Sequence, residues 1–218
     1  MNNLMQSILI GISNFPFFAV ILTLPIFATQ LMKYKAINPV RIAVNYVAIL
    51  YFLCLFALVF LPLPDMAKAS QLSGYKIQLI PFRFLADIIK ESPLVITNIH
   101  TYIPAIFHRA VLQVVFNVIM TIPFGMLLSY YFEFDAKKVF ISSLCLTLFI
   151  EIGQLTGLFF IYSGSYRFCD IDDIMANTLG GVIGYVAVKA CHFLPKIKSF
   201  DHQLVSLQRA KTTIALTR

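Results

Sequence analysis

Charged residues are scarce in this sequence. They make up 12% of its 218 residues, whereas hydrophobic residues make up 59% and the mean hydropathy is +0.83. Because soluble domains carry roughly 25% charged residues, this scarcity excludes a soluble globular protein and predicts one that crosses a membrane several times. The long apolar runs leave little chain for a separate soluble domain, so we expect a single membrane domain over residues 1–195.

Signals that define several other protein classes are also missing. The four cysteines show no Cys-x-x-Cys spacing, and Cys54, Cys145 and Cys191 fall in apolar segments, so we expect no disulfide framework. No Lys or Arg precedes the first apolar run, which argues against a cleaved signal peptide. No internal repeat supports an inverted-repeat transporter, and no serine lies in a recognisable nucleophile elbow.

Five apolar stretches are long enough to span a bilayer as helices. They run approximately over residues 8–31, 42–63, 105–131, 139–162 and 171–191. The sequence therefore predicts an all-α, polytopic membrane bundle of about five transmembrane helices.

The basic residues give a formal net charge of +7. In so apolar a chain we assign them to membrane topology and anionic lipid rather than to nucleic acid. Most of the 17 basic residues lie between the first two spans, between the third and fourth, or after the fifth, and the positive-inside rule makes that side cytoplasmic. We expect a multi-pass protein of the cell membrane, with the N-terminus outside and a basic cytoplasmic tail over residues 196–218.

The long outer loop between the second and third spans contains a short amphipathic pattern. Phe82, Leu85, Ile88 and Ile89 recur at helical spacing, and Pro81 suits the start of a helix. We therefore expect a short helix at the outer interface. The alternative is a plain connecting loop with a single helical turn.

Glu151 stands alone within the uncharged fourth span, residues 139–162. A carboxylate near the centre of a membrane helix costs about 3 kcal/mol on insertion scales. The rise per residue places it about 16 Å inside the outer end of that span. We expect Glu151 to point into the bundle, toward a functional site.

Polar residues recur on one face of each of the last three spans. They are Arg109, Gln113, Asn117 and Thr121 on the third span, Glu151 and Gln154 on the fourth, and Asp170, Asp173 and Asn177 on the fifth. Because polar faces are costly against lipid, we expect them to face one another and line a cleft open to the outside. Arg83, Arg109 and Arg167 would surround this cleft with positive charge, and Asp170 suits the N-cap of the fifth span.

A ridge of small residues, Ala176, Gly180 and Gly184, follows the acidic turn of the fifth span. Its spacing of four predicts that another helix approaches closely there. These glycines follow no strand, so they form no nucleotide-binding loop. Cys169 beside Asp170 is a weak candidate nucleophile, because the neighbouring negative charge disfavours a thiolate.

Two other interpretations of the polar residues stay open. A buried network of ion pairs and amides would fix the register of the helices without binding a ligand. Glu151, Asp170 and Asp173 would suit Mg²⁺ or Ca²⁺ if they converged, although we expect no resident metal and no cofactor.

Four stretches resemble motifs of a known family. They are Leu79-Ile-Pro-Phe82, residues 117–125, Glu151-Ile-Gly-Gln154 and residues 167–181. In these motifs, their order and their separations, residues 77–190 resemble the VanZ-like family. The resemblance implies an integral membrane protein, linked in some members to teicoplanin resistance. It carries over as motif positions Asn117, Glu151, Gln154, Asp170, Asp173 and Asn177, with Arg167 present in only some members. The long outer loop departs from the family pattern and leaves open an added docking element.

We expect the cleft to bind a cell-envelope amphiphile, such as a membrane lipid headgroup, a lipid-linked glycan precursor or a lipoglycopeptide. The predicted ligand-binding residues are Arg83, Arg109, Gln113, Asn117, Glu151, Gln154, Arg167, Asp170, Asp173 and Asn177. The alternative is a membrane-embedded enzyme that acts on a lipid headgroup or lipid-linked precursor, with Glu151 or Asp173 as general base. A small channel or transporter is a third class. The sequence gives neither the ligand nor the oligomeric state.

Overall fold

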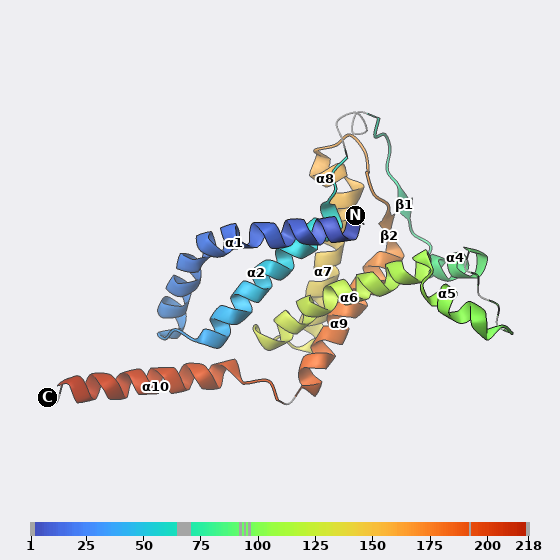
Figure 1. The fold of residues 1–218 in the computed structure, drawn as a ribbon. Helices are drawn as coiled ribbons and strands as arrows, with labels where there is room; N and C mark the ends of the chain where they lie inside the picture. The colour runs from blue at the N-terminus through green and yellow to red at the C-terminus, as the bar shows by residue number, and fades with distance from the viewer. Residues whose placement is uncertain are drawn as a thin grey trace. The chain divides into compact units, whose positions relative to one another are not determined.

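The computed structural model describes residues 3–64, 71–91, 93, 95, 97–191 and 193–216. Its helices and strands, drawn in Figure 1, are in chain order α1 (Asn3–Thr29), the π-helix η1 (Gln30–Tyr34), α2 (Pro39–Phe60), β1 (Ile77–Gln78), α4 (Arg83–Glu91), the 3₁₀ helix η2 (Ile99–Thr101), α5 (Tyr102–Ile106), α6 (Arg109–Tyr130), α7 (Ala136–Leu155), α8 (Gly157–Phe160), β2 (Cys169–Asp170), α9 (Ile171–Ala190) and α10 (Ile197–Leu216).

Within the described residues, five helices are long and apolar enough to cross a membrane: α1 with η1, α2, α6, α7 and α9. This confirms the predicted all-α membrane bundle. The chain divides into two compact units. Unit 1 comprises residues 1–62 and 191–218, and unit 2 comprises residues 63–190.

In unit 1, α1 packs along α2. Pro16 and Pro25 lie inside α1, where each removes a backbone hydrogen bond, and the helix is visibly bent in Figure 1. A side-chain bond of 2.7 Å joins Thr23 Oγ1 to the hydroxyl of Tyr46 on α2. The predicted basic tail forms the helix α10 as far as Leu216, and residues 217 and 218 lie outside the described residues.

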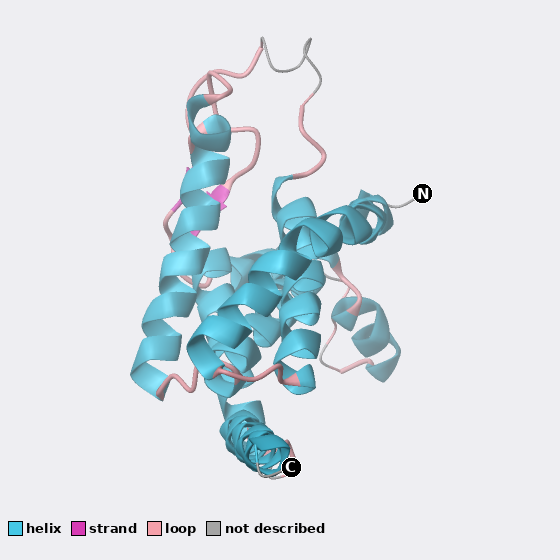
Figure 2. Cartoon of the chain, turned by 90° about the vertical axis from the view of Figure 1, so that its left-hand side faces the viewer, coloured by secondary structure: helices cyan, strands magenta, loops and turns pink. Residues whose placement is uncertain are grey.

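In unit 2, α9 packs against both α6 and α7. Figure 2, coloured by secondary structure, shows that helices make up most of the fold. The predicted small-residue ridge makes this packing possible. A Cβ added to Gly180 would lie 2.2 Å from the backbone oxygen of Val118 on α6, and one added to Gly184 would lie 2.1 Å from that of Ile122. The two helices therefore approach so closely that these positions require glycine.

The fourth span is shorter than the sequence predicts. α7 ends at Leu155, because Gly157 has a φ of 65° and the following residues, Leu158 to Phe160, also have positive φ. Glu151 consequently lies only about 6 Å from the end of its helix by the rise per residue. The estimate of about 16 Å was wrong, because apolar composition continues past the turn that ends the helix.

The third span is also shorter, since α6 begins at Arg109 and residues 102–106 form the separate helix α5. The predicted amphipathic helix is confirmed as α4. Two residues of the same loop form β1, which pairs in parallel with β2, so that Ile77 lies opposite Cys169 and Gln78 opposite Asp170. This strand pair joins the loop to the acidic start of α9.

Candidate functional site

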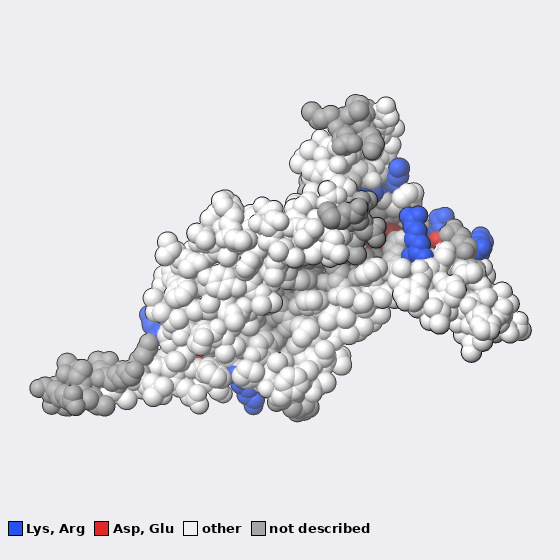
Figure 3. All heavy atoms as spheres, viewed as in Figure 1, with Lys and Arg blue, Asp and Glu red and all other residues white. Residues whose placement is uncertain are grey.

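Four carboxylates gather in unit 2 around the start of α9. They form the acidic cluster, defined as Glu151, Asp170, Asp172 and Asp173. Figure 3 shows acidic atoms at the surface in the region of β2 and α4, with basic atoms around them. The four carboxylates differ in their contacts. Three of them accept hydrogen bonds from backbone groups of the protein, and the fourth, Asp173, accepts hydrogen bonds from side-chain amides.

Asp170 directly precedes α9 and caps its N-terminus, as predicted. Its Oδ1 accepts a 2.9 Å hydrogen bond from the backbone N–H of Asp172, which is the bond that an N-cap side chain makes. The same oxygen accepts a bond of 3.2 Å from the side-chain amide of Gln78 on β1. Burial raises the pKa of Asp170, even though the positive charge of Arg83 lowers it. The hydrogen bonds of Asp170 therefore join β1, in the loop before α4, to the start of α9.

Asp172 anchors the start of α4. Its side chain is buried, and its two oxygens accept the backbone N–H groups of Phe82 at 2.6 Å and Phe84 at 3.1 Å. A carboxylate at a helix N-terminus satisfies donors that have no partner inside the helix and also meets the positive end of the helix dipole. Neither Asp172 nor Gln78 is among the site residues predicted from the sequence.

Asp173 meets the polar face of α6, as predicted. Its Oδ1 accepts a hydrogen bond from the side-chain amide of Asn117, and a longer one of 3.4 Å from that of Gln113. Gln113 is exposed, whereas Asn117 and Asp173 are half-buried. Asp173 is half-buried, like Asp170, but its hydrogen bonds come from side-chain amides alone, whereas each of the other three acids accepts a backbone N–H group.

Glu151 points into the bundle, as predicted, with only 2% of its surface exposed. Its Oε2 accepts the backbone N–H of Asp170 at 3.1 Å, and it shares a hydrogen bond with the thiol of Cys169. Burial, followed by the charge of Glu151, raises the pKa of Cys169 to about 11. A thiol with so high a pKa is protonated near neutral pH, which argues against Cys169 as a nucleophile.

Side-chain amides contact the cluster directly, whereas the arginines nearby lie at the ends of their elements. Arg83 and Arg109 are exposed at the starts of α4 and α6, and Arg167 is half-buried before β2. Among the described residues, neither Arg83 nor Arg109 forms an ion pair with the four carboxylates, and the charge of Arg83 reaches Asp170 only at longer range. Arg83 and Arg109 therefore provide positive charge near the cluster without neutralising it by ion pairs.

Below the cluster, a column of polar residues continues between α6, α7 and α9. Thr121 Oγ1 donates to the backbone oxygen of Asn177 at 2.7 Å, and the amide of Asn177 donates to Thr147 Oγ1 at 3.2 Å. All three residues are buried, as is Ser143 one turn further along α7. Asn177 Oδ1 and Ser143 Oγ have no hydrogen-bond partner in the part of the chain that the structure describes. Gln154, one turn beyond Glu151 on α7, is also buried.

The column follows a pattern that the sequence contains. Ser143, Thr147 and Glu151 are spaced by four on α7, as Asp173 and Asn177 are on α9. Only the spacing on α9 entered the sequence-based prediction. The spacing on α7 did not, because Ser and Thr are common in apolar helices and cost little there. Within the described ranges, no group of three or more His, Cys, Asp or Glu side chains is arranged to hold a metal ion.

A bundle of apolar helices built around buried and half-buried acids defines this molecule as a polytopic membrane protein. The profile of the VanZ/LLP1 family matches residues 48–192, so the chain belongs to that family. The match extends beyond the resemblance over residues 77–190 and takes in part of α2. No curated protein and no solved structure matches the chain.

Proposed function

We propose that the acidic cluster forms the outward-facing headgroup site for an amphiphile of the cell envelope, and that Asp173 is the carboxylate that meets the ligand. The observation that carries this proposal is the position of Asp173. It is half-buried, it is oriented by two side-chain amides from α6, and it forms no ion pair with any residue that the structure describes. The other three acids are bound to backbone groups of the protein itself.

The chemistry of the site suits a headgroup with both polar and anionic parts. A carboxylate held by amides accepts hydrogen bonds from an amine or a hydroxyl group. The exposed guanidinium groups of Arg83 and Arg109 would bind a phosphate or carboxylate in a bidentate manner, and Arg167 would add charge. A phospholipid headgroup, a lipid-linked glycan precursor and a lipoglycopeptide all combine these groups with an apolar anchor.

The helix α4 supplies the apolar contact that such an amphiphile needs. Leu85 is 48% exposed and Ile89 is 80% exposed. The helix α4 therefore has apolar side chains that the rest of the protein does not cover. Asp172 ties the start of this helix to α9. An amphipathic helix with exposed apolar residues would rest at the membrane interface, next to the headgroup site.

Membership of the VanZ/LLP1 family supports including a resistance phenotype in this proposal. Because some VanZ-like proteins are linked to teicoplanin resistance, we include a contribution to resistance against lipoglycopeptides in the proposal. In that case the site would bind either the drug or the envelope precursor that the drug recognises.

The test is ligand binding by the full chain in nanodiscs. Labelled phospholipids, lipid-linked precursors and teicoplanin would be titrated against the wild type, Asp173→Asn and Arg109→Ala. Asp87→Asn, an acid on α4 outside the cluster, is the matched control. The proposal expects weaker binding of at least one probe by the first two variants and unchanged binding by the control. Equal binding of every probe by all four proteins contradicts it.

Catalysis on a lipid headgroup or lipid-linked precursor is the alternative, and Asp173 is the better placed of the two candidate bases. Glu151 is 2% exposed and so is closed to a ligand, whereas Asp173 is half-buried. Lipid extracts of a deletion strain would distinguish the two functions. A missing product that is restored by the wild type and by Asp87→Asn, but not by Asp173→Asn, would favour an enzyme.

A further inference from the structure

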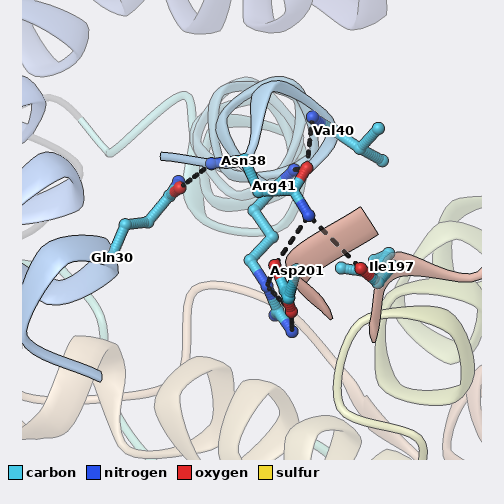
Figure 4. Close-up of polar contacts among 6 residues, drawn as sticks. All are labelled: Gln30, Asn38, Val40, Arg41, Ile197 and Asp201. Carbon is cyan, nitrogen blue, oxygen red and sulfur yellow. Dashed lines mark hydrogen bonds and ion pairs between the residues drawn. The ribbon is translucent and has the colours of Figure 1, made fainter. Parts of the chain in front are cut away.

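The C-terminal helix α10 is fixed to the start of α2 by a buried polar clamp within unit 1 (Figure 4). Arg41 donates from Nε and Nη2 to Asp201 Oδ2, at 3.0 and 2.7 Å, and the amide of Asn38 donates to Asp201 Oδ1 at 2.7 Å. The Asn38 amide also reaches the backbone oxygen of Ile197. The first turn of α10 therefore has a defined position against α2.

The clamp is closed on its other side by η1. Gln30 Oε1 accepts the backbone N–H of Asn38 at 2.8 Å, and the guanidinium of Arg41 lies 3.8 Å from the centre of the Tyr34 ring. Gln30, Asn38 and Arg41 are all at most 4% exposed. A bidentate ion pair at a buried position is costly to break, because one charge would be left without its partner.

This clamp ties the first turn of α10 to the end of a helix that is long and apolar enough to span a membrane. Asn38 is the N-cap of α2, so it marks the end of a membrane-spanning helix. A helix whose first turn is bonded to that N-cap begins at the membrane surface. Asp201, the acid of the clamp, is already paired, so it adds little negative charge to the exposed side of α10.

The two faces of α10 differ in the way that a surface helix requires. Ile197, Phe200, Leu204 and Leu207 recur at spacings of three and four, and Phe200 and Leu207 are 38% and 59% exposed. Polar side chains occupy the other side, where Lys198 and His202 are exposed. The sequence of α10 also contains Arg209 and Lys211. This combination of an apolar stripe with basic residues is typical of helices that lie in an anionic interface.

We propose that α10 is an in-plane membrane helix that binds anionic lipid headgroups at the membrane surface where α2 begins, with Phe200, Leu204 and Leu207 toward the acyl chains. The clamp holds its first turn at that surface, and the basic residues select anionic lipid. The proposal concerns unit 1 alone and does not depend on the headgroup site proposed for unit 2.

The chain contains no tryptophan, so a single introduced tryptophan reports the depth of α10. Leu207→Trp places it on the apolar stripe, and His202→Trp places it on the polar side as the control. Each full-length variant would be reconstituted into nanodiscs of brominated phosphatidylcholine, with or without brominated phosphatidylglycerol. A third protein would combine Leu207→Trp with glutamine at Lys198, Arg209 and Lys211.

We expect the bromine atoms to quench Leu207→Trp more than His202→Trp, and more strongly when phosphatidylglycerol is present. Each basic residue near an anionic surface changes binding about five-fold, so the glutamine substitutions should remove the dependence on phosphatidylglycerol. Three results overturn the proposal. They are equal quenching of Leu207→Trp with and without phosphatidylglycerol, quenching of His202→Trp as strong as that of Leu207→Trp, and blue-shifted emission of Leu207→Trp without quenching, which would mean that protein covers the stripe.

Discussion

Replacement of Asp172 should release the helix α4 while leaving the membrane spans in place. Asp172 accepts two backbone N–H groups at the start of α4, from Phe82 and Phe84. Hydrogen bonds to a charged group contribute about 1.5–3 kcal/mol each. In Asp172→Ala both bonds are lost, so local opening of α4 becomes easier by about 3 kcal/mol or more. That corresponds to roughly a 100-fold increase in the population of the open form.

Asp172→Asn should have an intermediate effect. Its remaining carbonyl oxygen still accepts one N–H group, while the NH₂ group faces the other donor and cannot accept from it. The loss of one charge-assisted bond gives an increase of about tenfold in local opening. The graded series of wild type, Asn and Ala therefore tests the two-oxygen geometry and not merely the presence of an acid.

Hydrogen–deuterium exchange of the full chain in nanodiscs measures this opening directly, because the amides of Phe82 and Phe84 are the donors themselves. Faster exchange should be confined to the peptide containing α4 and should rank Ala above Asn above wild type. Asp87→Asn, on α4 but away from its start, is the control. If Asp172→Ala exchanged no faster than Asp87→Asn, the assignment of Asp172 as the anchor of α4 would be refuted.

Three further predictions concern other parts of the chain. Gly180→Ala should lower the stability of the protein by a net ~2 kcal/mol, because the clash with the Val118 backbone oxygen falls at the upper end of the ~1–3 kcal/mol cost of overpacking and gained helix propensity offsets only about 1 kcal/mol. Val186→Leu on the exposed side of α9 should be neutral, and thermal unfolding in detergent compares the two variants. Burial alone would raise the pKa of Asp201, but its arginine and asparagine partners lower it below 3.8. The clamp therefore stabilises the protein above pH 3.8 and is lost as the pH falls through the lowered pKa. When the pH falls from neutral to below 3.8, the wild type should lose more thermal stability than Asp201→Asn does. Because the pKa of Cys169 is about 11, Cys169 should be alkylated far more slowly at pH 8 than a cysteine introduced at the exposed position 163 by Ser163→Cys. Mass spectrometry measures both rates, and comparable rates would contradict the contact between Cys169 and the buried Glu151.

The membrane bundle and part of the site could be predicted from the sequence, because both depend on local periodicity. The lengths of the apolar stretches predicted the membrane-spanning helices. The spacing of the polar residues on α6 and α9 predicted that the polar faces meet, and the hydrogen bond between Asn117 and Asp173 confirms it. The small-residue ridge was predicted for the same reason, since Gly180 and Gly184 lie on one face of one helix.

The features that could not be predicted depend on contacts between distant segments or on backbone angles that composition does not determine. Asp172 accepts hydrogen bonds from backbone N–H groups about ninety positions away. Every residue except proline has such a donor, so the pattern of side chains does not indicate which ones Asp172 will bind. Arg41 and Asp201 are separated by 160 positions, so nothing in either helix alone indicates their pairing. The early end of α7 depends on positive φ angles after Thr156, which apolar composition does not reveal.

The central claim is that Asp173, oriented by Asn117 and Gln113, is the open acid of a headgroup site. An experimental structure of the protein in nanodiscs of bacterial lipid tests it most directly. The account predicts that Asp173 keeps its amide partners on α6 and that the amine or hydroxyl of a bound headgroup lies within hydrogen-bond distance of its free oxygen. A structure in which this carboxylate faces acyl chains, or in which α6 and α9 are separated at their small-residue ridge, would contradict the account.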